Sequence, residues 1–333
     1  MRYGVPYQGS KNKIAGWVID NLPEDEILVD LFAGGCAVTH AALLSGKWDR
    51  IVANDIGDAP ELFCDAIDGK YVDEKRWISR EDFKNLKDTD PYVSLCWSFG
   101  NNRRTYLYAQ EVEPWKKALH YARVFGDCSL LREMGIDSDG SSGDVRKHHD
   151  EYKEKYIRWW LSKQKYTSAE LDKLIANVKA DIERDEEELR QYLIVALKKS
   201  RLQELQSLQS LQRLQSLQSL EKYKNNLTIT RKSYADVAIP DNAVVYADPP
   251  YKGTNIEGYK CEFDYGEFEN WLAAVPFMVI VSEYNATAGC VEIASIKKQS
   301  TLAQGNKGGT NTEKLFVQER FYNEYLQKMG RLF

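Results

Sequence analysis

The segment ILVDLFAGGCAVT, residues 27–39, decides the expected fold, because it reads as a buried strand, a turn of small residues and the start of a helix. Glycines in such a turn, here Gly34 and Gly35, let the backbone approach a ligand closely at the carboxyl end of the strand. The next apolar run, IVANDI at 51–56, brings Asp55 about twenty residues further on, where an acid can accept hydrogen bonds from both ribose hydroxyls of an adenosine.

The turn has neither a phosphate-binding lysine nor a complete G-x-G-x-x-G. This disfavours a nucleotide with a phosphate tail. An adenosine with a different tail fits better, and S-adenosylmethionine is the obvious candidate.

A second motif is DPPY, residues 248–251, which follows the apolar run AVVYA at 243–247. A strand that ends there presents the Asp248 carboxylate, the Pro249 carbonyl and the Tyr251 ring together. Neither proline has an N–H, so the backbone offers only acceptors. Such a pocket suits a planar base whose exocyclic amine must stay unprotonated. The alternative is a proline-stiffened turn after a core strand.

Short apolar strands alternate with helical stretches at 27–60 and 243–320, which predicts an α/β fold with a parallel sheet and helices on both faces. The segment between the two motifs is charged, helical in character and too long for a plain loop. We therefore predict a discontinuous catalytic domain, residues 1–90 and 226–333, and an inserted lobe, residues 91–225.

Leucine recurs at every third position from residue 202 to residue 220. An α-helix advances about 100° per residue, so this row slips around the axis by roughly 60° at each step and cannot form a straight seam. We predict a helical arm at about 200–221, packed in a hairpin against residues 169–198. The alternative is an arm that reaches along DNA or meets a second subunit.

Within the predicted lobe, WSFGNNRRTYLY at 97–108 combines two amides, two guanidinium groups and several aromatic rings. Asn and Arg are the side chains that read adenine and guanine edges through paired hydrogen bonds. The formal net charge of −5 weakens a nucleic-acid interpretation, but phosphate contacts depend on local patches, and bases outnumber acids between 196 and 232. The DNA contacts that we predict are Asn101, Asn102, Arg103, Arg104 and Tyr106, and the alternative is an ordinary polar turn.

The two motifs, in this order, resemble the Dam-type DNA adenine-N6 methyltransferases of the D12 class, in which a target-recognition segment separates the cofactor motif from the catalytic tetrapeptide. YGVPYQGSK at 3–11, SYADV at 233–237 and VIVSEYN at 279–285 match further stretches of that family. The similarity covers residues 1–60 and 228–333 well and the middle loosely. One departure is Cys36, where the family has a second loop glycine.

The resemblance implies a Rossmann-like, S-adenosylmethionine-dependent methyltransferase sheet with an inserted, mainly helical target-recognition lobe. It implies a site-specific enzyme that methylates N6 of an adenine flipped out of duplex DNA. The catalytic residues carried over are Asp248, Pro249, Pro250 and Tyr251. The cofactor residues carried over are Tyr7, Lys11, Asp30, Phe32, Gly34, Gly35, Asp55, Asp236 and Asp248.

The resemblance also implies a role for several of these residues. Asp248 and the Pro249 carbonyl accept hydrogen bonds from N6, and Tyr251 stacks on the flipped base. Orientation and electrostatics then supply most of the acceleration, with no covalent intermediate and no metal. For the cofactor, Asp55 holds the ribose, Asp236 the adenine amine, and Tyr7 and Lys11 the methionine part.

Two alternatives stay open: an RNA adenine-N6 methyltransferase and a catalytically inactive DNA-binding homologue. No apolar run approaches the ~18 residues of a membrane span, and the start lacks the apolar region of a secretory signal. The six scattered cysteines argue against a zinc site and a disulfide framework. We expect a monomer or weak dimer on double-stranded DNA in the cytoplasm of a bacterial or phage-infected cell, with a cognate restriction endonuclease as a candidate partner.

Overall fold

The chain divides into two compact units in the computed structural model, which describes residues 2–163, 169–170, 205–252, 263–285, 287–299 and 310–331. The sheet unit comprises Met1–Glu74, Leu86–Arg104 and Ser210–Phe333, and the helical unit comprises Lys75–Asn85 and Thr105–Gln209. The organisation is discontinuous, but the boundaries differ from those predicted. Residues 91–104 and 210–225 belong to the sheet unit, and 75–85 to the helical unit.

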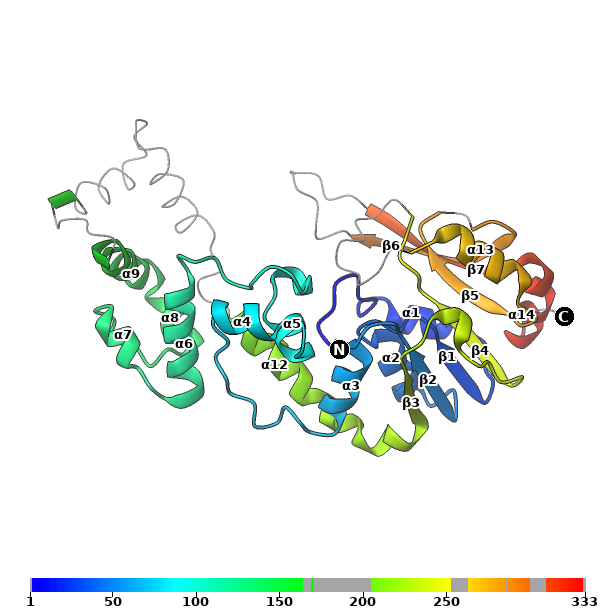
Figure 1. Ribbon diagram of the computed structural model, residues 1–333, viewed down its shortest axis with the longest axis horizontal. Helices are drawn as coiled ribbons and strands as arrows, with labels where there is room; N and C mark the ends of the chain where they lie inside the picture. The colour runs from blue at the N-terminus through cyan, green and yellow to red at the C-terminus, as the bar shows by residue number, and fades with distance from the viewer. Residues whose placement is uncertain are drawn as a thin grey trace. The chain divides into compact units, whose positions relative to one another are not determined.

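The sheet unit is built on seven described strands in the order β3-β2-β1-β4-β5-β7-β6 (Figure 1). β7 pairs antiparallel with both β5 and β6, and the other pairs are parallel. This confirms the α/β, Rossmann-like fold, with the correction that the sheet is mixed. The bounds are β1 (Ile27–Asp30), β2 (Arg50–Asn54), β3 (Leu227–Thr230), β4 (Ala243–Ala247), β5 (Val279–Glu283), β6 (Cys290–Gln299) and β7 (Thr310–Gln318).

The pairing of β1 with β4 determines where a ligand can bind. From β1 the chain goes on to β2 and from β4 to β5, on opposite sides of the β1–β4 pair. Adjacent strands whose connections diverge in this way leave a crevice at their carboxyl ends. Asp30 lies opposite Tyr246 in the register, so the turn after β1 and the tetrapeptide after β4 emerge side by side.

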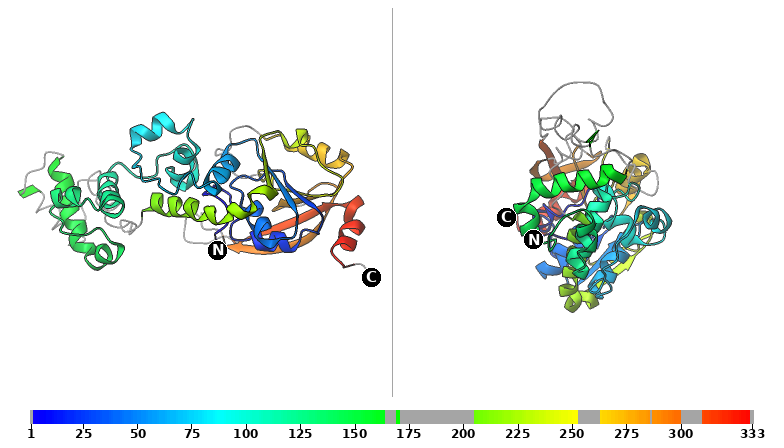
Figure 2. Two further views of the ribbon diagram at one scale, coloured as in Figure 1. Left: turned by 90° about the horizontal axis from the view of Figure 1, so that it is seen from below. Right: turned by 90° about the vertical axis from the view of Figure 1, so that its left-hand side faces the viewer.

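The apolar composition of β1, β4 and β5 explains why these strands lie in the middle of the sheet. All residues of β1 and β5 are buried, which is typical of strands covered on both faces. β1, β4 and β5 share a core cluster with Phe268 and Leu272 of α13. α14 packs against β7 (Figure 2). The α-helices of the sheet unit include α1 (Ala15–Asp20), α2 (Ala37–Ser45), α3 (Ala59–Ile67), α5 (Pro91–Cys96), α13 (Tyr265–Ala274) and α14 (Tyr322–Lys328).

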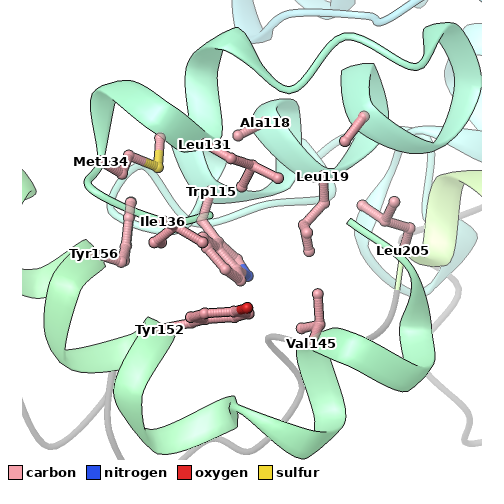
Figure 3. Close-up of a cluster of buried hydrophobic side chains, with 11 residues drawn as sticks. Trp115, Ala118, Leu119, Leu131, Met134, Ile136, Val145, Tyr152, Tyr156 and Leu205 are labelled. Carbon is pink, nitrogen blue, oxygen red and sulfur yellow. The ribbon is translucent and has the colours of Figure 1, made fainter. Parts of the chain in front are cut away.

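The helical unit has a hydrophobic core of its own (Figure 3). Its centre is Trp115 and Leu119 of α6, packed with Tyr152 of α9. α6 has a proline in its first turn and ends at the left-handed Gly126, the usual start and stop signals of a helix. The described helices here are α4 (Arg80–Leu86), whose last residue belongs to the sheet unit, α6 (Glu113–Phe125), α7 (Ser129–Glu133), α8 (Ser142–Lys147) and α9 (His149–Lys163).

The leucine repeat forms α12 (Gln206–Ser216) and the 3₁₀-helix η2 (Leu217–Asn226). A 3₁₀-helix has three residues per turn, so leucines spaced by three share one face in η2, where Leu217 and Leu220 are both buried. η2 contacts α3. Residues 210–226 are therefore a packed part of the sheet unit and not a projecting arm. Most of the segment 169–198, predicted to form a hairpin with it, lies outside the described residues.

Polar side chains of the repeat also form hydrogen bonds with neighbouring segments of the sheet unit. The Arg213 guanidinium donates to the backbone carbonyls of Gly4, at 2.7 Å, and of Tyr3. The Gln215 amide donates to the Val72 carbonyl at 2.9 Å. These bonds attach the repeat to the amino-terminal segment and to the connection after α3.

Replacing Leu214, which is fully buried, by alanine tests this packing. We expect Leu214→Ala to lower the free energy of unfolding by about 3 kcal/mol, because it leaves a cavity in a packed interface. Gln212→Ala, on the exposed side of the same helix, should change it by less than about 0.5 kcal/mol. Urea unfolding of both variants provides the measurement, and equal, small effects would mean that the repeat is not packed.

Candidate active site

A cavity of about 260 Å³ lies at the carboxyl ends of β1 and β4, entirely within the sheet unit. Its walls come from the amino-terminal segment, the turns after β1 and β2, the connection before β4, and the tetrapeptide. It brings together most of the cofactor residues predicted from the sequence: Tyr7, Lys11, Asp30, Phe32, Gly34, Gly35, Asp55 and Asp248, together with Pro250 and Arg103. Other predicted residues do not line it: Pro249, Tyr251, Asp236, Asn101, Asn102, Arg104 and Tyr106.

The glycine turn is covered by the amino-terminal segment. The Val5 N–H donates to the Gly35 carbonyl at 2.8 Å. A Cβ on Gly35 would lie 2.5 Å from the Tyr7 Cβ, and one on Gly4 would overlap the Gly35 carbonyl oxygen. Gly4 also has a φ of +70°, a backbone angle that residues other than glycine rarely adopt. Both glycines are therefore required for this close approach of two backbones.

Cys36 occupies the position where the resemblance predicts a second loop glycine. Its φ of 55° and ψ of 37° are left-handed, so the backbone keeps a conformation suited to glycine although a side chain is present. The side chain is fully buried, and burial raises the pKa of its thiol well above the usual value. A thiol held in its neutral form is a poor nucleophile.

Asp55 follows β2 and faces the same turn. Its carboxylate accepts the N–H of Gly34 at 2.8 Å and the N–H of Gly57 at 2.7 Å. Burial raises the pKa of this carboxyl, and the two N–H donors oppose that shift. Each carboxylate oxygen can accept more than one hydrogen bond, so capacity for further donors remains.

Asp30 ends β1 below the turn and is almost fully buried. The Thr39 hydroxyl donates to it at 2.7 Å. Burial raises the pKa of the Asp30 carboxyl to about 7, and the nearby charges of Asp248 and Asp55 act in the same direction.

Aromatic rings form one wall of the cavity. The Phe32 ring centroid lies 5.3 Å from that of Tyr234 and 5.8 Å from that of Phe263. All three residues line the cavity, and together they offer apolar faces to a planar ligand. Asp236, predicted to bind an adenine amine, is exposed at the end of the 3₁₀-helix η3 (Tyr234–Asp236) and does not line this wall.

The Asp248 carboxylate is paired with Lys11. The Lys11 Nζ lies 2.8 Å from Asp248 Oδ1 and 3.6 Å from Oε1 of Glu313, a residue of β7. Burial raises the pKa of Asp248; the Lys11 charge opposes this shift, and the Glu313 charge adds to it. Lys11 thus contacts the predicted catalytic acid directly, whereas the sequence predicted it only at the methionine end of the cofactor.

Tyr251 is held on several sides. Its hydroxyl is bonded to the Ser282 hydroxyl at 2.9 Å and to Glu313, and its backbone carbonyl accepts from the Tyr265 hydroxyl at 3.0 Å. The ring is buried, with Lys11 Nζ 4.5 Å from its centroid. Its predicted stacking on a base stays a prediction.

Three side chains that fix the tetrapeptide were missed from the sequence: Ser282, Glu283 and Glu313. Glu283, at the end of β5, accepts the N–H of Lys252 at 3.2 Å. Glu313 lies on the same face of β7 as the buried residues Leu315 and Val317. An acid on the core-facing side of a strand was the signal that could have revealed it.

The predicted DNA contacts lie in two different units. In the sheet unit, the Asn101 amide donates to the Leu95 carbonyl at 2.7 Å, and Arg103 pairs with Asp58 at 2.5 Å. Asn102 lies between them and is partly exposed, and Arg104 is exposed. In the helical unit, Tyr106 is buried and donates its hydroxyl to the Ile78 carbonyl at 2.7 Å, so its predicted DNA contact is corrected to a core position.

Gly4→Ala tests the close packing on the glycine turn, and Gly46→Ala is its matched control. Both glycines have a left-handed φ, but a Cβ on Gly46 meets nothing within 4 Å. Each variant should lose about 1–2 kcal/mol of unfolding free energy from backbone strain. We expect Gly4→Ala to lose clearly more, because its Cβ displaces the amino-terminal segment. Equal losses in thermal or urea unfolding would contradict this.

Asp30→Asn tests the raised pKa of this carboxyl. The folded wild type binds a proton at Asp30 up to about pH 7, whereas the unfolded chain releases it near 3.8. Wild-type stability should therefore fall across this window as pH rises, by up to about 1.4 kcal/mol per pH unit. Asparagine cannot titrate and still accepts from Thr39. We expect the variant to gain stability relative to wild type as the pH rises from about 4 to about 7; a constant difference across that range would exclude the shift.

Part of the chain is similar to known proteins. Residues 7–134 match the family model of the D12 class N6 adenine-specific DNA methyltransferases, a range that includes the glycine turn and Asp55 but ends before the tetrapeptide. The chain is also 42% identical over 53 residues to the type II methyltransferase M2.HphI of Haemophilus parahaemolyticus, which is 16% of this chain and only 15% of that relative. The resemblance to this family that the sequence predicted is thereby confirmed over residues 7–134.

Proposed function

We propose that this chain is a site-specific DNA methyltransferase that transfers the methyl group of S-adenosylmethionine to N6 of an adenine flipped out of duplex DNA. The observation that carries the proposal is the shared cavity of the glycine turn and the Asp248 carboxylate, at the adjacent ends of β1 and β4. The match of residues 7–134 to adenine-specific DNA methyltransferases and the similarity to a type II methyltransferase support it.

The residues around the cavity fit S-adenosylmethionine. When bound, this cofactor supplies an electrophilic methyl group on a positively charged sulfur. Asp55 has acceptor capacity left for ribose hydroxyls, and the ring of Phe32 offers a face to adenine. The carboxyl groups of Asp30 and Asp248 lie at the same cavity, where a cation is favoured.

Asp248 would act on the amine of the target base. The lone pair of adenine N6 is delocalised into the ring, so the amine is a weak nucleophile. A hydrogen bond from N6 to the ionised Asp248, and a second one to the Pro249 carbonyl, would favour a tetrahedral nitrogen. Its lone pair would then point at the methyl group. Positioning and electrostatics are the main sources of acceleration in such a transfer.

Double-stranded DNA is the proposed substrate, because the base must leave its stack before N6 becomes accessible. The exposed residues Phe99 and Arg104 and the partly exposed Asn102 are candidates for DNA contact in the sheet unit. Such an enzyme would work in the cytoplasm of a bacterial or phage-infected cell, as a monomer or weak dimer, with or without a cognate restriction endonuclease. In the part of the chain that the structure describes, no helix combines the length and apolar character needed to cross a membrane.

Methyl transfer from tritiated S-adenosylmethionine to duplex DNA, single-stranded DNA and RNA tests the proposal directly. We expect duplex DNA to be labelled best and N6-methyladenine to be the product in nucleoside analysis. Preferred labelling of RNA would support the RNA-modifying alternative. Binding of DNA without any transfer would support an inactive homologue.

Asp248→Ala should reduce methyl transfer by about 10²–10³-fold, because the main acceptor for the N6 hydrogen is lost. Binding of S-adenosylmethionine, measured by calorimetry, should remain detectable, since the ribose and adenine contacts are unchanged. Undiminished transfer in this variant would refute the mechanism.

A further inference from the structure

Glu313 is a buried acid that the mechanism above does not use. Its side chain is completely inaccessible, and its neighbours along the same face of β7 are the apolar residues Leu315 and Val317. Burying a carboxylate is costly unless charges and hydrogen bonds compensate for the lost water. An apolar residue would be the ordinary choice at this position of a core strand.

The partners of Glu313 all surround the catalytic tetrapeptide. Its Oε1 accepts the hydroxyls of Tyr251 and of Ser282, the latter at 2.9 Å. The same oxygen lies 3.6 Å from Lys11 Nζ. Lys11 in turn lies 2.8 Å from Asp248. The partly buried Asp248 and the fully buried Glu313 therefore share one ammonium group.

The Tyr251 ring has a defined place within this cluster. Lys11 Nζ lies 4.5 Å from its centroid, and the Tyr284 ring meets it edge-on at a centroid distance of 4.5 Å. The hydroxyl end of the ring is fixed by Glu313 and Ser282. Loss of the Glu313 carboxylate would remove a hydrogen-bond partner of the Tyr251 hydroxyl and one of the acids beside the Lys11 ammonium.

A target amine and Lys11 compete for the same carboxylate. If N6 is to donate to Asp248, the ammonium that now lies 2.8 Å away must share that acid or move. Glu313 offers a second acid close by, and its Oε2 is buried without a hydrogen-bond partner among the described residues. Lys11 can thus remain in the site, neutralised, while Asp248 engages the base.

We infer that Glu313 is a positioning residue of the active site, which holds the Tyr251 ring in place and keeps Lys11 beside Asp248 as the base binds. This inference rests on the function proposed above. Glu313 acts through Tyr251 and Lys11 and touches neither the base nor the methyl donor.

Single-turnover methyl transfer to duplex DNA at saturating cofactor tests this role. Glu313→Gln keeps the shape of the side chain and removes its charge, and Tyr251→Phe keeps the ring and removes the hydroxyl. We expect each to lower the rate at least tenfold while the Kd for S-adenosylmethionine changes less than twofold. The double variant should be no more than twofold slower than the slower single variant, because both substitutions remove the same hydrogen bond between Tyr251 and Glu313.

Glu292→Gln is the matched control. Glu292 lies on the neighbouring strand β6, is partly exposed and pairs with Lys314 at 2.8 Å, away from the cluster. The same substitution there should leave the rate unchanged. A wild-type rate in Glu313→Gln, or strictly additive losses in the double variant, would overturn the positioning role.

The pH dependence of the same rate separates positioning from a general loss of structure. The Glu313 charge contributes to the raised pKa of Asp248, whereas Lys11 opposes it. Glu313→Gln should therefore move the acid limb of the profile to lower pH, and Glu292→Gln should not. Asp30 and Glu283, whose charges also interact with Asp248, are unchanged in both variants.

An acid limb that stays in place in Glu313→Gln would overturn the inference. A wild-type chain that fails to methylate DNA would refute the proposed function itself, and the positioning role with it. Methyl transfer by the wild type and by Glu292→Gln therefore distinguishes a failure of the positioning role from a failure of the proposed function.

Discussion

Parallel pairing of β1 with β4 is the constraint on which the rest of the site depends. These strands lie more than two hundred residues apart in the chain, yet Asp30 lies opposite Tyr246 in the register. Everything that follows either strand must then emerge at one edge of the sheet. Because the chain continues in opposite directions from the two strands, the space between their ends stays open. An insertion as large as the helical unit is compatible with this arrangement, since it interrupts the connection between β2 and β3 and leaves the central pairs intact.

The acids of this site carry an electrostatic cost, because burial disfavours their charged forms. The carboxyl groups of Asp30, Asp55 and Asp248 all have a raised pKa, each mainly through burial. Lys11 compensates only part of this charge, through its contacts with Asp248 and Glu313. A cationic ligand would reduce the remaining repulsion between the acids. Its binding would therefore restore part of the folding stability that burial of these acids costs. This is the physical reason why a cluster of acids can persist beside a cavity.

Local patterns predicted the parts of the site that lie next to one another in sequence. The glycine turn, Asp55 and DPPY could each be recognised because an apolar strand followed by a small or acidic residue is a local signal. Positions that depend on distant partners could not be recognised in this way. Tyr106 looked like a DNA contact in a polar stretch, but its side chain is buried in the helical unit and its hydroxyl donates to the Ile78 carbonyl. Glu313 was missed because its partners, Tyr251 and Lys11, come from elements far away in the chain.

The leucine repeat shows what a sequence period can predict of a structure and what it cannot. A spacing of three cannot give a straight seam on an α-helix, and this much followed from the sequence. The structure that accommodates a leucine period of three depends on the surface against which the leucines pack. Here the chain changes from α12 to the 3₁₀-helix η2, in which a period of three matches the turn and keeps Leu217 and Leu220 buried. The repeat therefore leads the chain directly back into β3, and from there to β4 and the DPPY tetrapeptide. The segment predicted as a helical arm is thus the one that returns the chain to the site.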